Sequence, residues 1–190
     1  PMKEETDLEL HIDRLLPRAV ELATTSVQYR EKAAACEFLE ASVKLCIGRS
    51  ARQSGARGSE PKDFSGLYAK LFPAMLTLAT DADSFARQLF APLTFQVIHW
   101  LSSNVKGENA ETIAMLEAIM GALGDEEHSG RREFAARCLG EFIQWSIKHN
   151  RSAKEGALNV SSLLRRLSAL AHHPSGMQRL GFAFALNSPY

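Results

Sequence analysis

The sequence predicts an all-α fold made of tandem helical hairpins, mainly because one pattern recurs. Three times, an apolar helical segment is followed by a short polar turn and then by an arginine sixteen residues after the segment starts. The segments start at Leu71, Met115 and Leu163, and the arginines are Arg87, Arg131 and Arg179. Repeats of this length with two helices each are typical of HEAT and armadillo arrays. We therefore expect an α-solenoid of about four HEAT-like hairpins in a right-handed superhelical stack.

The first repeat is expected over residues 8–47. Apolar residues at helical spacing predict a helix over 8–23 and a second over 29–47, where Gly48 is a natural helix stop. Pro17 interrupts the first helix and should kink it, because proline removes one helical hydrogen bond. Residues 48–63 contain no aliphatic side chain larger than alanine, which predicts a flexible linker inside one continuous segment of 1–190.

The remaining repeats are expected over 64–103, 110–149 and 159–187. In the second repeat, Pro73 recurs at the place of Pro17. The predicted helices cover 64–79, 84–103, 110–123, 130–149 and 161–171, followed by one that starts after Pro174 and ends near residue 185. Nothing in the sequence alternates with the two-residue period of a strand.

Composition excludes several classes of function. Twenty-two basic residues balance twenty-two acidic ones, so binding of nucleic acid by the whole surface is disfavoured. No apolar run is long enough to predict a membrane span or a signal peptide. Cys36, Cys46 and Cys138 are odd in number and lie among apolar helical residues, which predicts buried free thiols in a reducing compartment.

Two acid–arginine pairs have the same spacing, Asp81 with Arg87 and Asp125 with Arg131. We expect each carboxylate to accept backbone N–H groups in its turn, and each arginine to reach an acid of the neighbouring repeat. This is a structural role, and we predict no catalytic, metal or cofactor site in the chain. The six histidines do not have zinc-ligand spacing, and nucleotide-binding, kinase and hydrolase motifs are absent.

Several strings have counterparts, in the same order, in a known family: Leu71-Phe72-Pro73, Arg87-Gln88-Leu89-Phe90-Ala91-Pro92-Leu93, Gln96-Val97-Ile98-His99-Trp100, Trp145-Ser146-Ile147-Lys148 and Leu170-Ala171-His172-His173-Pro174. They resemble the helical-repeat region of the catalytic subunits of DNA-dependent protein kinases. The resemblance covers nearly the whole chain except residues 48–63.

The resemblance implies a piece of the large solenoid of a nuclear serine/threonine kinase of the phosphatidylinositol-3-kinase-related family. Such kinases join DNA double-strand breaks by non-homologous end joining. It implies as partners the rest of the solenoid, the Ku heterodimer and, through the complex, DNA ends. ATP and magnesium would bind in a kinase domain that this chain does not contain. Two alternatives remain open, a HEAT or armadillo adaptor of an unrelated complex and a module that contacts DNA directly through clusters such as Arg131-Arg132 or Arg165-Arg166.

Overall fold

The computed structural model of the chain describes residues 12–55, 65–104, 110–149 and 160–187. All the regular secondary structure in these ranges is helical. The helices are α1 (Ile12–Thr25), α2 (Tyr29–Gly55), α3 (Ser65–Leu78), α4 (Ser84–Asn104), α5 (Ala110–Leu123), α6 (Ser129–His149), α7 (Val160–Ala171) and α8 (Gly176–Asn187). The predicted all-α repeat fold is confirmed, whereas the right-handedness of the stack stays a prediction.

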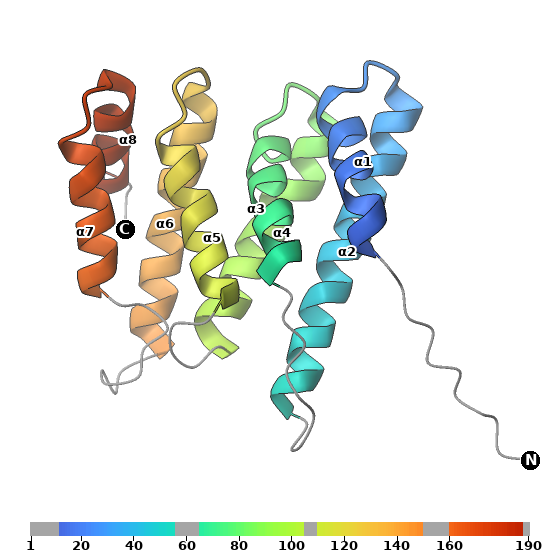
Figure 1. The fold of residues 1–190 in the computed structure, drawn as a ribbon, viewed down its shortest axis with the longest axis horizontal. Helices are drawn as coiled ribbons and strands as arrows, with labels where there is room; N and C mark the ends of the chain where they lie inside the picture. The colour runs from blue at the N-terminus through green and yellow to red at the C-terminus, as the bar shows by residue number, and fades with distance from the viewer. Residues whose placement is uncertain (1–11, 56–64, 105–109, 150–159, 188–190) are drawn as a thin grey trace, which may run out of the picture.

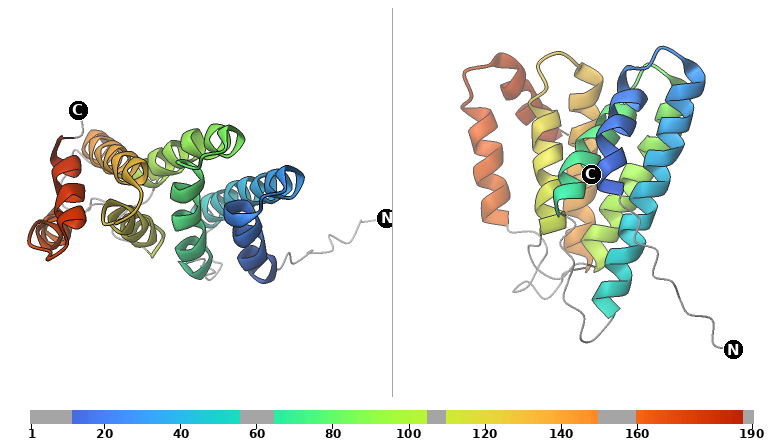
Figure 2. Two further views of the ribbon diagram at one scale, coloured as in Figure 1. Left: turned by 90° about the horizontal axis from the view of Figure 1, so that it is seen from above. Right: turned by 45° about the vertical axis from the view of Figure 1, so that its right-hand side comes forward.

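Consecutive helices form four antiparallel hairpins whose short turns all lie at the same end of the stack (Figure 1). Viewed from above, the first helices of the hairpins make one layer and the second helices another (Figure 2). Within the first layer α1 packs on α3 and α3 on α5, and within the second α2 packs on α4, α4 on α6 and α6 on α8. The second helix of a hairpin also packs on the first helix of the preceding hairpin in two places, α6 on α3 and α8 on α5.

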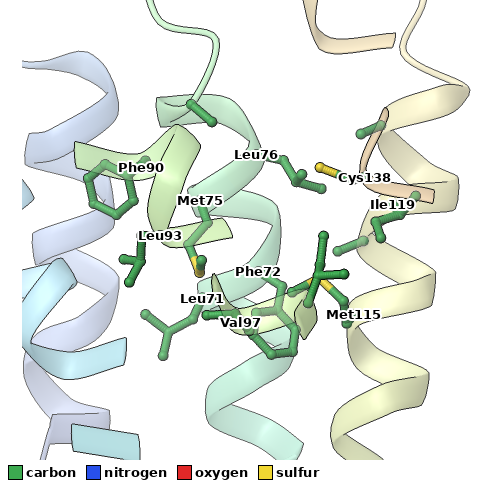
Figure 3. Packing of buried hydrophobic residues seen from close by; sticks show 14 of the residues in the cluster. Leu71, Phe72, Met75, Leu76, Phe90, Leu93, Val97, Met115, Ile119 and Cys138 are labelled. Atoms are coloured by element: carbon green, nitrogen blue, oxygen red, sulfur yellow. The ribbon is translucent and has the colours of Figure 1, made fainter. Parts of the chain in front are cut away.

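One apolar core runs along the stack between the two layers. In its middle, Leu71, Phe72 and Met75 of α3 face side chains of both neighbouring helices, α4 and α5 (Figure 3). Those partners include Phe90 of α4 and Met115 of α5, which are themselves fully buried. The apolar face of α3 is therefore covered both by the partner helix of its own hairpin and by the next hairpin, as expected for a solenoid.

The expected helix stop at Gly48 is wrong, because α2 continues to Gly55. A glycine ends a helix when it takes a left-handed conformation, and Gly48 does not have a positive φ. A glycine inside a helix costs only about 1 kcal/mol relative to alanine, so the helix can pass through it. The first part of the predicted linker is thus helical, while residues 56–63 lie outside the described residues, as do the expected helix starts at residues 8 and 64.

Both predicted repeat prolines lie inside first helices, Pro17 in α1 and Pro73 in α3. Both are exposed, so their rings face away from the core. Proline has no N–H, and residue 73 therefore donates no helical hydrogen bond to the carbonyl of Ala69.

Candidate functional site

The four turns that join first and second helices share one hydrogen-bond pattern. In each, a side chain near the start of the turn accepts the backbone N–H of the residue two positions further on. The acceptor and donor pairs are Ser26 with Gln28 (3.2 Å), Asp81 with Asp83 (2.8 Å), Asp125 with Glu127 (2.9 Å) and His173 with Ser175 (3.1 Å). The acidic residues predicted to bind turn N–H groups, Asp81 and Asp125, do so.

A basic residue occupies the fourth position of every second helix: Lys32, Arg87, Arg132 and Arg179. The backbone N–H groups of these residues bond the carbonyls of residues 28, 83, 128 and 175, each of which directly precedes its helix. The four residues are therefore structurally equivalent.

The three arginines of this set close the turns onto the second helices. Arg87 Nη1 donates to the carbonyls of Asp81 and Ala82, the latter at 2.6 Å. Arg179 Nη1 donates to the carbonyls of His173 and Pro174 at 2.8 and 2.7 Å.

Arg132 makes the same contact in the third hairpin, where its Nη1 donates to the carbonyl of Asp125 at 2.6 Å. In all three cases the carbonyl belongs to the residue whose side chain starts the turn. We call this contact the arginine lock.

The expected ladder from each arginine to an acid of the next repeat is wrong. Arg87 bonds carbonyls of its own turn, and Arg131 pairs with Asp125 of its own turn at 2.6 Å. Arg131 is also not the equivalent of Arg87, because four residues, starting with Asp125, precede α6, whereas three residues, starting with Asp81, precede α4. Counting six residues from the turn acid identifies Arg131 as the counterpart of Arg87. Counting from the start of the second helix identifies Arg132, which makes the same contact as Arg87.

Hairpins one and two are connected by an ion pair that the sequence pattern does not predict. Lys32 Nζ of α2 lies 2.9 Å from both carboxylate oxygens of Asp81 in the turn between α3 and α4. Both side chains are mostly buried, so the pair is screened less than a surface pair. The acid of the second turn is thus bound by a lysine of the preceding hairpin.

Asp125 has the most heavily bonded carboxylate of the turns. Partial burial raises its pKa, but hydrogen bonds from the backbone N–H groups of His128 and Glu127, together with the charge of Arg131, outweigh burial and hold the pKa below its ordinary value. The ionised carboxylate is therefore part of the folded turn at neutral pH.

A polar cluster joins the far ends of α4 and α6. His99 Nε2 lies 2.9 Å from Glu141 Oε2, and the His99 ring stacks on Trp145 with ring centres 4.1 Å apart. Trp145 Nε1 donates to the same carboxylate at 3.1 Å, and Lys148 lies over the indole. Trp145 of α6 thus packs against α4 of the preceding hairpin.

The other residues singled out in the sequence do not converge on a reactive centre. Cys36, Cys46 and Cys138 are buried free thiols, as predicted. Burial raises the pKa of Cys36 to about 11 and raises that of Cys138 further, which keeps both protonated and unreactive at neutral pH. Among the described residues, no group of three or more possible metal ligands occurs.

Of the basic clusters considered for DNA contact, Arg131 and Arg132 are occupied by their turn. Arg165 is exposed on α7. The described helices include none that is both long and apolar enough to span a bilayer.

A groove lies on the outer face of the first layer, between α3 and α5. It encloses about 320 Å³, and its walls and floor are Ala69, Pro73, Leu76, Thr77, Ala114, Glu117, Ala118, Gly121 and Ala122. Asp125 and Arg131 close it at the turn end. No motif or spacing in the sequence predicts a groove at this place in the stack.

Comparisons with known proteins place the chain in a family. Residues 62–190 match the family model for the CC1/2 region of the DNA-dependent protein kinase catalytic subunit. The chain is 39% identical to the DNA-dependent protein kinase catalytic subunit of Dictyostelium discoideum over the whole chain. It is 40% identical to those of Mus musculus and Gallus gallus over 95% of the chain.

The chain spans only about 4% of the length of these relatives. The similarity nevertheless extends across all four hairpins, and the matching family model covers well over half of the chain. The chain therefore belongs to the DNA-dependent protein kinase catalytic subunit family, as a segment of its helical-repeat region.

Proposed function

We propose that the chain is a non-catalytic scaffold segment of a DNA-dependent serine/threonine protein kinase that acts in the nucleus, in double-strand break repair by non-homologous end joining. Its task is to form part of the helical wall that holds the other parts of the kinase in place. The similarity to catalytic subunits over a small part of their length supports a structural segment of a much larger protein.

The apolar outer face of the fourth hairpin is the observation that carries this proposal. Leu164 of α7 occupies the repeat position of Phe72 in α3 and Leu116 in α5. Phe72 and Leu116 are 0% and 5% exposed, whereas Leu164 is 60% exposed. Met177, Leu180 and Leu186 of α8 are exposed as well.

Apolar side chains at a repeat position are normally covered by the next repeat. We infer that a further hairpin of the longer protein covers this face. Such end-to-end packing is what a scaffold segment needs.

The polar groups of the chain also favour a structural role. The arginine locks bond carbonyls within their own turns, and Asp81 pairs with Lys32 of the preceding hairpin. ATP and magnesium would bind elsewhere in the longer kinase, and Ku and DNA ends would be partners of the assembled complex.

The test uses the longer kinase with Leu164→Glu inside this segment. Placing a charge in the covered face should lower the yield of folded protein and its DNA-stimulated peptide phosphorylation, because an unpaired buried charge is costly. Val27→Glu is the matched control, since Val27 is almost fully exposed in the first turn.

Wild-type yield and activity in the Leu164→Glu kinase would contradict the scaffold role. A second result would contradict the non-catalytic part of the proposal. If the purified 190-residue chain transferred phosphate from ATP to a peptide, the segment would be catalytic in its own right.

A further inference from the structure

We propose that the groove between α3 and α5 binds a short amphipathic helix with aliphatic and basic side chains. The partner places an aliphatic side chain against the groove floor and a lysine or arginine at Glu117. This goes beyond the scaffold role, because it assigns a binding surface to the outer layer of the stack.

Helices α3 and α5 lie side by side (Figure 1), and the groove runs between them. Its residues on α3, Ala69, Pro73, Leu76 and Thr77, share one helical face, and so do Ala114, Glu117, Ala118, Gly121 and Ala122 on α5. Small side chains on both walls leave the groove open, and buried Leu76 makes its floor apolar. Apolar grooves of this kind commonly bind the apolar face of an amphipathic helix.

Two residues in the walls are unfavourable for the helices that contain them. Gly121 lies inside α5, where a Cβ atom would meet nothing within 4 Å. The packing of this chain therefore does not require glycine there, although glycine costs the helix about 1 kcal/mol relative to alanine. Open space above a helical glycine is what the close approach of another backbone requires.

Pro73 is the second unfavourable residue, on the opposite wall. Because residue 73 has no N–H, the carbonyl of Ala69 receives no hydrogen bond from it. Ala69 itself lines the groove and is exposed. Pro73, like Gly121, therefore weakens its own helix at the wall of the groove.

The charges of the groove favour a basic partner. Asp125 and Arg131 at the turn end neutralise each other at 2.6 Å. Glu117 on the α5 wall has a 61% exposed side chain, and its contact with Arg166 of α7 is long, at 3.7 Å. Glu117 therefore has only a long ion pair within the chain and an exposed carboxylate that can accept a cation of the partner.

The volume sets the size of the inserted group. About 320 Å³ accommodates one or two aliphatic side chains rather than a whole domain. A helix of a few turns, held by one apolar anchor and one ion pair, fits these dimensions.

The experiment measures binding of a designed probe to the 190-residue chain by fluorescence anisotropy. The probe is a stapled, alanine-rich helix with two leucines one turn apart and flanking lysines. A second probe replaces the lysines by glutamates, and a third replaces the leucines by serines. We expect only the first probe to bind.

Gly121→Leu fills the groove and should weaken binding of the first probe by at least about tenfold, the loss of one anchoring side chain. Gly48→Leu is the matched control, because Gly48 is also an exposed helical glycine with open space around it, on α2. A thermal melt of each variant checks that it is folded.

Glu117→Gln should weaken binding roughly two- to fivefold, as for an exposed ion pair. Its control is Glu37→Gln on α2, which should leave binding unchanged.

Three outcomes would overturn the proposal: no binding of the leucine–lysine probe at the highest soluble concentration, equal binding by Gly121→Leu and Gly48→Leu, or a preference for the glutamate probe. This assay uses the chain alone, so its failure leaves the scaffold role standing. Conversely, failure of the Leu164→Glu test in the longer kinase does not bear on the groove.

Discussion

At the scale of single residues, the arginine lock solves a problem that every helical hairpin has. Carbonyls at a helix end and in the turn after it have no helical N–H partner. In three hairpins one guanidinium supplies the missing donors, two carbonyls for Arg87 and Arg179 and one for Arg132. Hydrogen bonds from a charged donor are stronger than neutral ones, so a single arginine can fix the angle between the two helices.

Arg87→Ala should lower the free energy of unfolding by about 1 kcal/mol, because two turn carbonyls lose their donor. The carboxylate of Asp81 keeps its partner Lys32 in this variant, so the loss comes from the carbonyls. In a thermal melt the change corresponds to a midpoint lower by roughly 2–4 °C. Arg30→Ala is the control, because Arg30 is an exposed arginine in the first turn of α2, and it should leave the midpoint unchanged. Equal midpoints for the wild type and both variants would contradict the arginine lock.

Asp125→Asn should reduce stability at neutral pH and have little effect in acid. The folded pKa of Asp125 lies below its ordinary value of 3.8, so the stability it contributes is fully present above that pH and is lost as the pH falls through the folded pKa. Urea unfolding of both proteins at neutral pH and at several values below 3.8 measures the difference. A difference that stays constant, or that grows in acid, would show that the ionised carboxylate is not what holds the turn.

At the scale of elements, two helical glycines have opposite surroundings. A Cβ at Gly121 of α5 would meet nothing within 4 Å, whereas one at Gly181 of α8 would lie 1.9 Å from the carbonyl oxygen of Leu123. The second helix of the fourth hairpin can thus approach the end of α5 only because residue 181 has no side chain.

Gly121→Ala should therefore raise the free energy of unfolding by about 0.5–1 kcal/mol, the difference in helix propensity. Gly181→Ala should lower it by about 1–3 kcal/mol, because α8 must move away from α5. Denaturant unfolding of both variants decides the matter. A Gly181→Ala variant as stable as the wild type would contradict the close packing of α8 on α5, and a destabilised Gly121→Ala variant would contradict the open space at Gly121.

Local pattern predicted the elements well, because helices are set by residues close in sequence. The bounds of α5 and the turn acids at Asp81 and Asp125 follow directly from apolar spacing and polar turn residues. The equivalence of Arg132 and Arg87 could not be read that way, because one extra residue in the third turn breaks the constant spacing. The basic fourth position of each second helix is a signal that alignment by helix start would have found.

Contacts between hairpins were the part that sequence reasoning missed. Lys32 and Asp81 are 49 residues apart, and the residues around each of them give no sign that the two side chains pair. The groove has the same origin, since its walls come from separate repeats and only their packing brings Pro73 and Gly121 together. Such features depend on how far each hairpin rotates on the next.

At the scale of the whole molecule, the chain is a row of hairpins in which each one is stabilised mainly by its neighbours. The middle of the row, α3 to α6, has partners on both sides, while the fourth hairpin has an exposed outer face. Stability in such an array is a sum of repeat and nearest-neighbour terms, so the ends should open before the middle.

Native-state hydrogen exchange of the 190-residue chain, read by mass spectrometry, tests this claim most directly. Amides of α3 to α6 should be the most protected, and those of α7 and α8 the least among the described helices. Leu163→Ala, which removes a buried side chain of α7, should speed exchange in α7 and α8 and leave α3 and α4 as in the wild type. Equal loss of protection in all eight helices would instead indicate one cooperative globule and contradict the solenoid.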